Sequence, residues 1–147
     1  MKKTYLTPHI KREISKVVNF LLKKYRNSDP FFIARELGIE YRFINFTREL
    51  LAFSERSSCK DLGTIYLNNN LGKYEQKLLC AHELAHLCLH VDDDSNLFDK
   101  DIDPQKEAEA NYFVALLLPH VFINVNINAM SDEEINNYIL HKINPFE

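Results

Sequence analysis

One apolar stretch constrains the fold of this chain more than any other, because it carries polar side chains that an apolar helix cannot bury alone. Residues 78–89 contain no proline and no glycine, and Glu83 is their only charged residue. His82 and His86 are four residues apart, so they lie on the same face of a helix. Two imidazoles and a carboxylate are costly to bury in such surroundings without partners. The segment therefore predicts a buried helix built around a bound group.

The residue types in this helix favour a zinc ion. Two histidines one helical turn apart can both reach one zinc at about 2.0–2.1 Å. Glu83 lies at the rim of the metal's open side, where a general base acting on water must sit. His90 is eight residues beyond His82, which is about 12 Å along a straight helix, so the three histidines cannot meet at one ion. We interpret His90 as a helix C-terminal residue, favoured there by the helix dipole.

A third ligand is expected from the next helical segment. Glu107 and Asn111 are four residues apart and share a helix face. A helix packed against the histidine helix would present Glu107 to the metal, while Asn111 hydrogen-bonds the outer nitrogen of a ligand histidine. Glu109 points roughly opposite and is the weaker candidate. With His82 and His86 as the other ligands, the fourth position stays open for water.

Helix, strand and cap signals predict an α+β fold in a single domain. Proline follows a cap residue at Thr7 and at Asp29, and Ser131 with Glu134 forms a capping box. The four expected parts are N-terminal helices at 1–38, a small sheet of about three strands at 39–68, the two site helices at 72–119, and C-terminal helices at 120–147.

Composition argues against several classes of partner. The net charge is -3, so nucleic acid is not an expected direct partner. No apolar run approaches the ~20 residues that span a bilayer, and no secretory signal is visible at the start of the chain. Three cysteines without scaffold spacing suit a reducing compartment, so we expect a cytoplasmic protein. Asp92, Asp93 and Asp94 are interpreted as part of a solvated loop, because the glycine and spaced oxygens of an EF-hand are missing.

Two segments, residues 82–90 and 107–119, together resemble the ImmA/IrrE family of metallopeptidases. That family shows a zinc-helix motif, then a glutamate followed by alanine and asparagine or aspartate, a phenylalanine, and a double leucine running into proline. Residues 65–68 are also similar to the family. Val114 and Leu118 depart from its usual alanine and methionine without touching the chemistry. The matched site residues are His82 and His86 as ligands, Glu83 as catalytic glutamate and Glu107 as the glutamate ligand.

The resemblance implies a zincin-like core and a zinc-dependent endopeptidase of a bacterium, phage or mobile element. Such proteins act as anti-repressors, because they cleave or inactivate a helix-turn-helix repressor. The strand at 64–67 is expected to be an edge on which an extended substrate pairs its backbone. A second oxyanion donor remains open among four residues: His120, Tyr66, Tyr74 and Tyr112.

Two alternatives stay open beside the peptidase. One is a non-catalytic regulatory module of the same fold that binds a repressor without cleaving it. The other is a domain with a structural zinc ion. Structural zinc sites usually have four protein ligands rich in cysteine, and no cysteine pair in this chain has ligand spacing.

Overall fold

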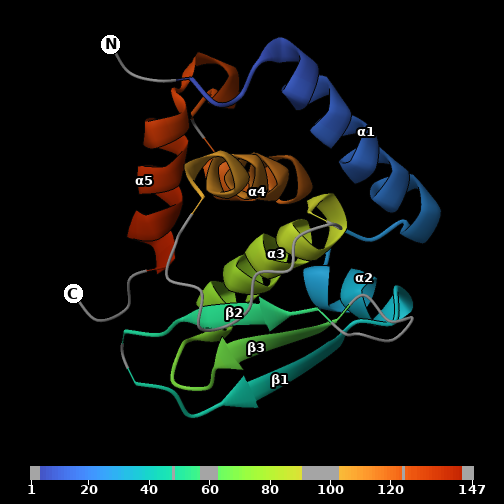
Figure 1. The fold of residues 1–147 in the computed structure, drawn as a ribbon, viewed down its shortest axis with the longest axis vertical. Coiled ribbons are helices and arrows are strands. Elements are labelled where there is room, and N and C mark those ends of the chain that lie inside the picture. Colours follow the sequence, from blue (N-terminus) through green and yellow to red (C-terminus); the bar gives the residue numbers. More distant parts are fainter. Residues whose placement is uncertain (1–3, 48, 57–62, 91–102, 124, 144–147) are drawn as a thin grey trace.

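The computed structural model describes residues 4–47, 49–56, 63–90, 103–123 and 125–143. Within these residues, three strands form one small mixed sheet, and five α-helices lie beside and above this sheet (Figure 1). The α+β class predicted from the sequence is confirmed. The acidic segment interpreted above as a solvated loop lies outside the described residues. In the part of the chain that is described, no helix is long and apolar enough to cross a membrane.

Two capped helices open the chain at the positions that the sequence predicts. Helix α1 (Pro8–Tyr25) begins behind Thr7, and α2 (Pro30–Glu36) begins behind Asp29. Each cap side chain accepts a backbone N–H from the first turn of its helix. Each helix also has proline in its first turn, where the missing N–H removes no helical hydrogen bond. Local cap chemistry therefore fixes both helix starts.

The sheet has the order β1-β3-β2, so the last strand in sequence is the central one. Strand β3 (Thr64–Asn68) pairs parallel with β1 (Glu40–Ile44) and antiparallel with β2 (Ala52–Glu55). The expectation that β3 is an edge for substrate pairing is therefore wrong, because its backbone is paired on both sides. The apolar alternation of β3 shows that one of its faces is buried, but it does not reveal which strands lie beside it.

The buried side chain of Asn68 links the end of β3 by hydrogen bonds to the loop between β1 and β2. Its Nδ2 donates to the carbonyl oxygens of Thr47 at 3.1 Å and Leu50 at 3.0 Å. Its Oδ1 accepts the N–H of Asn70 at 2.9 Å. Asn68 is fully buried, so these partners replace the water that its amide would otherwise bind. This amide therefore helps to hold the sheet end just ahead of the next helix.

Asn68→Ala is expected to lower the free energy of unfolding by about 2–3 kcal/mol, because it removes a buried amide that donates to two backbone carbonyls and accepts one backbone N–H. Urea unfolding followed by circular dichroism measures the change. Asn70→Ala is the matched control, since its side chain is exposed; we expect a change within about 0.5 kcal/mol. Equal losses for the two variants would contradict a special role for the buried amide.

Helix α3 (Lys73–Leu89) lies between the sheet and α4 (Pro104–Leu117) (Figure 1). It packs on the strands β2 and β3 on one side and on α4 on the other. Because it has neighbours on several sides, its middle is apolar nearly all round. The buried core that surrounds it draws on every layer of the fold, and its largest fully buried apolar side chains are Phe113, Ile33, Ile65, Leu67, Leu78, Leu84, Leu117, Leu118, Ile135, Val18 and Val114.

After Pro119 ends α4, two 3-10 turns that the sequence did not reveal lead into α5 (Asp132–Ile143). The predicted capping box is present: Glu134 N–H donates to Ser131 Oγ at 3.1 Å, and Ser131 N–H donates to Glu134 Oε1 at 3.2 Å. Helix α5 packs on α4, the helix that carries Glu107 and Asn111.

Candidate metal centre

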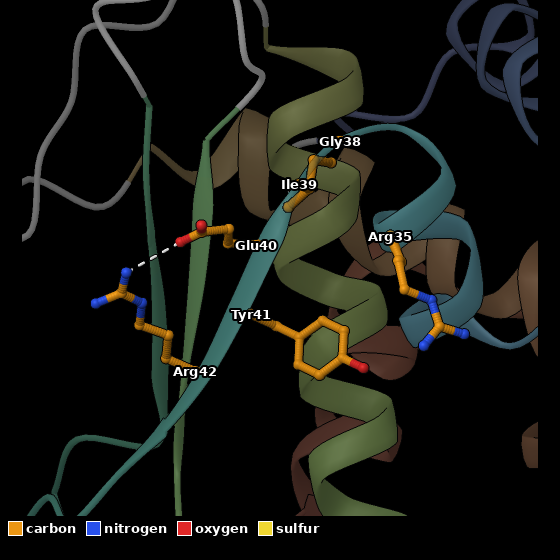
Figure 2. Close-up of a pocket in the computed structure, with 6 residues that line it drawn as sticks. All are labelled: Arg35, Gly38, Ile39, Glu40, Tyr41 and Arg42. Atoms are coloured by element: carbon orange, nitrogen blue, oxygen red, sulfur yellow. Dashed lines mark hydrogen bonds and ion pairs between the residues drawn. The ribbon is translucent and has the colours of Figure 1, made fainter.

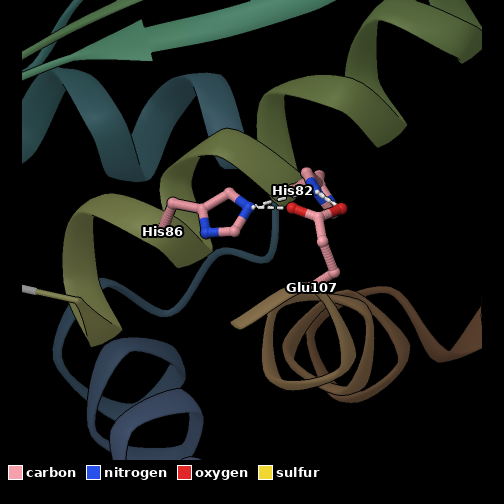
Figure 3. Close-up of side chains that lie close together, drawn as sticks. All are labelled: His82, His86 and Glu107. Carbon is pink, nitrogen blue, oxygen red and sulfur yellow. Dashed lines mark hydrogen bonds and ion pairs between the residues drawn. The ribbon is translucent and has the colours of Figure 1, made fainter. Parts of the chain in front are cut away.

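Three side chains from two helices converge on one point (Figure 3). The Nε2 atoms of His82 and His86 are 3.2 Å apart. Glu107 Oε1 lies 2.9 Å from His86 Nε2, and Glu107 Oε2 lies 3.2 Å from His82 Nε2. The structure therefore brings together the two histidines of α3 and the glutamate of α4 that the sequence singled out.

Local structure explains why these side chains meet. His82 and His86 stand one turn apart in the buried middle of α3. Glu107 lies in the first turn of α4, whose start is fixed by the Asp103 cap and by Pro104. The backbone N–H of Glu107 donates to the carbonyl of Asp103 at 3.0 Å. The cap thus fixes the residue at which α4 begins. This start determines which part of α3 Glu107 faces when the two helices pack.

The donor set fits a zinc ion. Two imidazole nitrogens and a carboxylate oxygen are among the usual zinc ligands. Ligand atoms at 2.0–2.1 Å from a tetrahedral zinc lie roughly 3.3–3.4 Å from one another by simple geometry. The separations of 2.9–3.2 Å between the three side chains are close to that spacing, so small shifts would admit the ion.

The electrostatics of the cluster also suit a cation. Burial alone would raise the pKa of Glu107, but hydrogen bonds from His82 and His86 hold it well below its usual range. Burial alone would lower the pKa of His82, yet the hydrogen bond and charge of Glu107 raise it instead. A half-buried carboxylate anion therefore lies beside two nitrogen donors. A metal ion can take the place of the proton through which a histidine contacts Glu107.

Glu83 and Asn111 lie next to this cluster. Glu83 is buried, with 9% of its surface exposed, and its charge also helps to raise the pKa of His82. Asn111 stands one turn beyond Glu107 on α4, where a further hydrogen bond to His82 contributes to the same shift. Its Nδ2 donates to Asn136 Oδ1 on α5 at 2.8 Å. The sequence placed Asn111 beside a ligand histidine, but the link to α5 was not predicted.

His90 and Glu109 form a pair that the sequence did not suggest. His90 Nδ1 lies 3.0 Å from His86 Nδ1, and His90 Nε2 lies 2.9 Å from Glu109 Oε1. His90 does cap the C-terminus of α3, as expected. However, burial lowers its pKa and outweighs Glu109, so a charged imidazolium facing the helix dipole is not what holds it there. The spacing of four between the second and third histidines was the available signal.

Comparison with known proteins places the chain in a family. The family model described as the IrrE N-terminal-like domain, of peptidase family M78, matches residues 34–139, which include the whole cluster. This chain belongs to the ImmA/IrrE family of metallopeptidases. It is also 34% identical over 113 residues to "Uncharacterized immunity region protein 2" of Bacillus phage phi105, a match that covers 72% of this chain and 68% of the phage protein. No solved structure matches this chain.

The family assignment agrees with the architecture around the cluster. In this ImmA/IrrE protein the histidine helix and the glutamate helix pack against each other beside a small sheet. That arrangement is consistent with the zincin-like core that the resemblance implied.

The four residues considered as second oxyanion donors form no hydrogen bond with the cluster in the described structure. Tyr66, for example, donates to Glu55 Oε2 at 3.4 Å.

A groove opens beside the cluster in this family member. It has a volume of about 930 Å³, and Glu107 and Asn111 form part of its wall. The side chain of Glu107 is 36% exposed, compared with 13% for His82, so the cluster is more open on the Glu107 side. A second hollow of about 460 Å³ lies against β1 and the end of α2, and none of the three clustered residues lines it (Figure 2). The groove, not the hollow, is therefore the space that adjoins the cluster.

Proposed function

We propose that this protein is a zinc-dependent endopeptidase that cleaves or inactivates a helix-turn-helix repressor of a phage or mobile element. The observation that carries the proposal is the convergence of His82, His86 and Glu107, with Glu83 beside them, in a chain of a metallopeptidase family. The phage relative is named for an immunity region, which supports a role in the control of phage genes. A repressor is a cytoplasmic target, so the proposal includes a cytoplasmic location.

In the proposed mechanism, His82, His86 and Glu107 hold the zinc, and Asn111 helps to orient His82. When bound, zinc supplies a Lewis acid that lowers the pKa of water toward ~7 and polarises the scissile carbonyl. Glu83 accepts a proton from the attacking water as the new C–O bond forms. Glu83 then returns this proton to the amine as the C–N bond breaks, so the products are one carboxylic acid and one amine.

The groove and the sheet edge next to α3 are the surfaces that we propose for the substrate. The groove adjoins Glu107, so a polypeptide lying in it passes close to the cluster. In the described part of the chain β2 is an edge strand that packs on α3, whereas the other edge, β1, packs on α2. An extended peptide can add to such an edge through backbone hydrogen bonds. The β2 edge thus replaces β3 as the proposed pairing strand.

The proposal is tested by incubating the zinc-loaded protein with the helix-turn-helix repressor encoded nearest to its own gene. Mass spectrometry of the products is expected to show two fragments that add up to the repressor plus one water. Removing zinc with a chelator is expected to stop the cleavage, and adding zinc back is expected to restore it. Tight repressor binding without fragments would contradict the peptidase and favour the non-catalytic module.

A further inference from the structure

A second hydrogen-bonded network begins on the side of His86 that faces away from Glu107. His86 uses Nε2 toward Glu107 and Nδ1 toward His90, at 2.9 Å and 3.0 Å. His90 in turn directs Nε2 at Glu109 Oε1, 2.9 Å away. Gln105 Nε2 then donates to the other carboxylate oxygen of Glu109 at 2.6 Å. One continuous chain of contacts therefore leads from the cluster to a carboxylate that is not part of it.

The order of donors and acceptors along this chain follows from simple proton counting. A carboxylate only accepts, so the Glu109 oxygen requires the proton of neutral His90 to be on Nε2. The Nδ1 atom of His90 is then an acceptor, and the Nδ1 atom of His86 must donate to it. A metal ion held by the cluster would take the place of the proton that Nε2 of His86 gives to Glu107, so that Nε2 could ligate the metal while the Nδ1–H of His86 still donates to His90.

The surroundings hold this network in place. The side chain of His90 is only 6% exposed and that of Glu109 is 19% exposed. Arg56 Nη2 donates to the carbonyls of His86 at 3.4 Å and His90 at 2.9 Å, which fixes the backbone at the end of α3. Gln105 Nε2 also donates to a backbone carbonyl of the N-terminal segment at 2.9 Å, which limits the freedom of its own amide.

We propose that His90 and Glu109 are positioning residues that fix the tautomer and ring orientation of His86 for metal binding. The inference rests on the zinc site of the proposed function. Metal-ligating histidines commonly donate their outer N–H to a carboxylate directly. Here the carboxylate of Glu109 acts through a second histidine, so one ligand is set by two residues in series.

The proposal predicts different effects for different replacements of His90. His90→Leu removes the acceptor for His86 and is expected to raise the zinc dissociation constant 10–100-fold, as is usual for the loss of such partners. His90→Asn keeps a carbonyl oxygen near the place of Nδ1, so we expect zinc affinity within about threefold of wild type. Both constants are measured by competition with a chromophoric chelator.

Glu109→Gln tests the carboxylate with little change of shape. Gln105 donates to one oxygen of this side chain, so the introduced amide would turn its NH₂ group toward His90 and reverse the tautomers along the chain. Weakening like that of His90→Leu is expected. Gln76→Met is the matched control, because it removes another polar contact of α3, to the backbone of Asn68, at the opposite end of the helix from His90. It is expected to leave zinc affinity unchanged.

Nitrogen-15 NMR of the imidazoles in the zinc-loaded wild-type protein tests these tautomers, which a purely structural contact between the helices would not fix. We expect His86 to carry its proton on Nδ1 and His90 on Nε2. A proton on Nδ1 of His90 in the zinc-loaded protein, or zinc affinity within threefold of wild type for both His90→Leu and Glu109→Gln, would overturn the proposal. Wild type that binds zinc with these tautomers but cleaves no repressor would refute the proposed function alone.

Discussion

Glu83→Gln is expected to keep its zinc and to cleave the repressor at least 100-fold more slowly than the wild-type protein. The substitution preserves the shape of a buried side chain on α3 but removes its ability to accept a proton. General acid–base catalysis by a positioned side chain contributes about 10²–10⁴-fold, so most of that factor is lost. Single-turnover cleavage rates, measured on samples of known zinc content, give the ratio.

The matched control for this change is Glu75→Gln, which removes one carboxylate from the first turn of the same helix. Its cleavage rate and zinc content are expected to stay within about twofold of wild type, since this half-buried side chain lies two helical turns before the first histidine. A Glu83→Gln protein that retains full zinc and cleaves at the wild-type rate would show that Glu83 is not the base.

Glu107→Gln is expected to weaken zinc binding by at least about 100-fold, more than the loss of an outer-shell partner. The variant keeps the size of the side chain but removes the anion that faces both histidines. Cleavage should fall in proportion to the zinc that is lost, and excess zinc should restore part of it. Chelator competition and cleavage assays over a range of zinc concentrations measure the two effects.

Glu40→Gln serves as the control for Glu107, because it removes a carboxylate from an exposed pair with Arg42 on β1. Zinc affinity is expected to remain unchanged in this variant. Unaltered zinc affinity in Glu107→Gln would mean that the carboxylate of α4 is not a ligand, and the open three-ligand site would then have to be abandoned.

The features that could be predicted from the sequence are those set within one helix or one turn. The caps at Thr7, Asp29 and Ser131 each act within three residues, so the helix starts were predictable. The shared face of His82 and His86 follows from the helical repeat. Glu107 required one further step, that the next helix packs across the first.

The features that could not be predicted depend on which segments become neighbours in space. The central place of β3 is set by pairing with two strands that both precede it, and its own sequence does not reveal them. The contact of Glu109 with His90 depends on the angle at which α4 crosses α3. The hydrogen bond from Asn111 to Asn136 likewise depends on where α5 returns to the core. The two side-chain contacts join residues 19 and 25 positions apart along the chain.

Zinc-edge X-ray absorption of the purified, zinc-loaded protein reads the ligand set directly. The spectrum is expected to show only nitrogen and oxygen neighbours at about 2.0–2.1 Å, with the outer-shell scattering of two imidazoles. Glu107→Gln should alter this first shell, whereas Glu83→Gln should leave it unchanged. Sulfur neighbours at about 2.3 Å, or a wild-type protein that binds no zinc, would contradict a metal centre built from His82, His86 and Glu107.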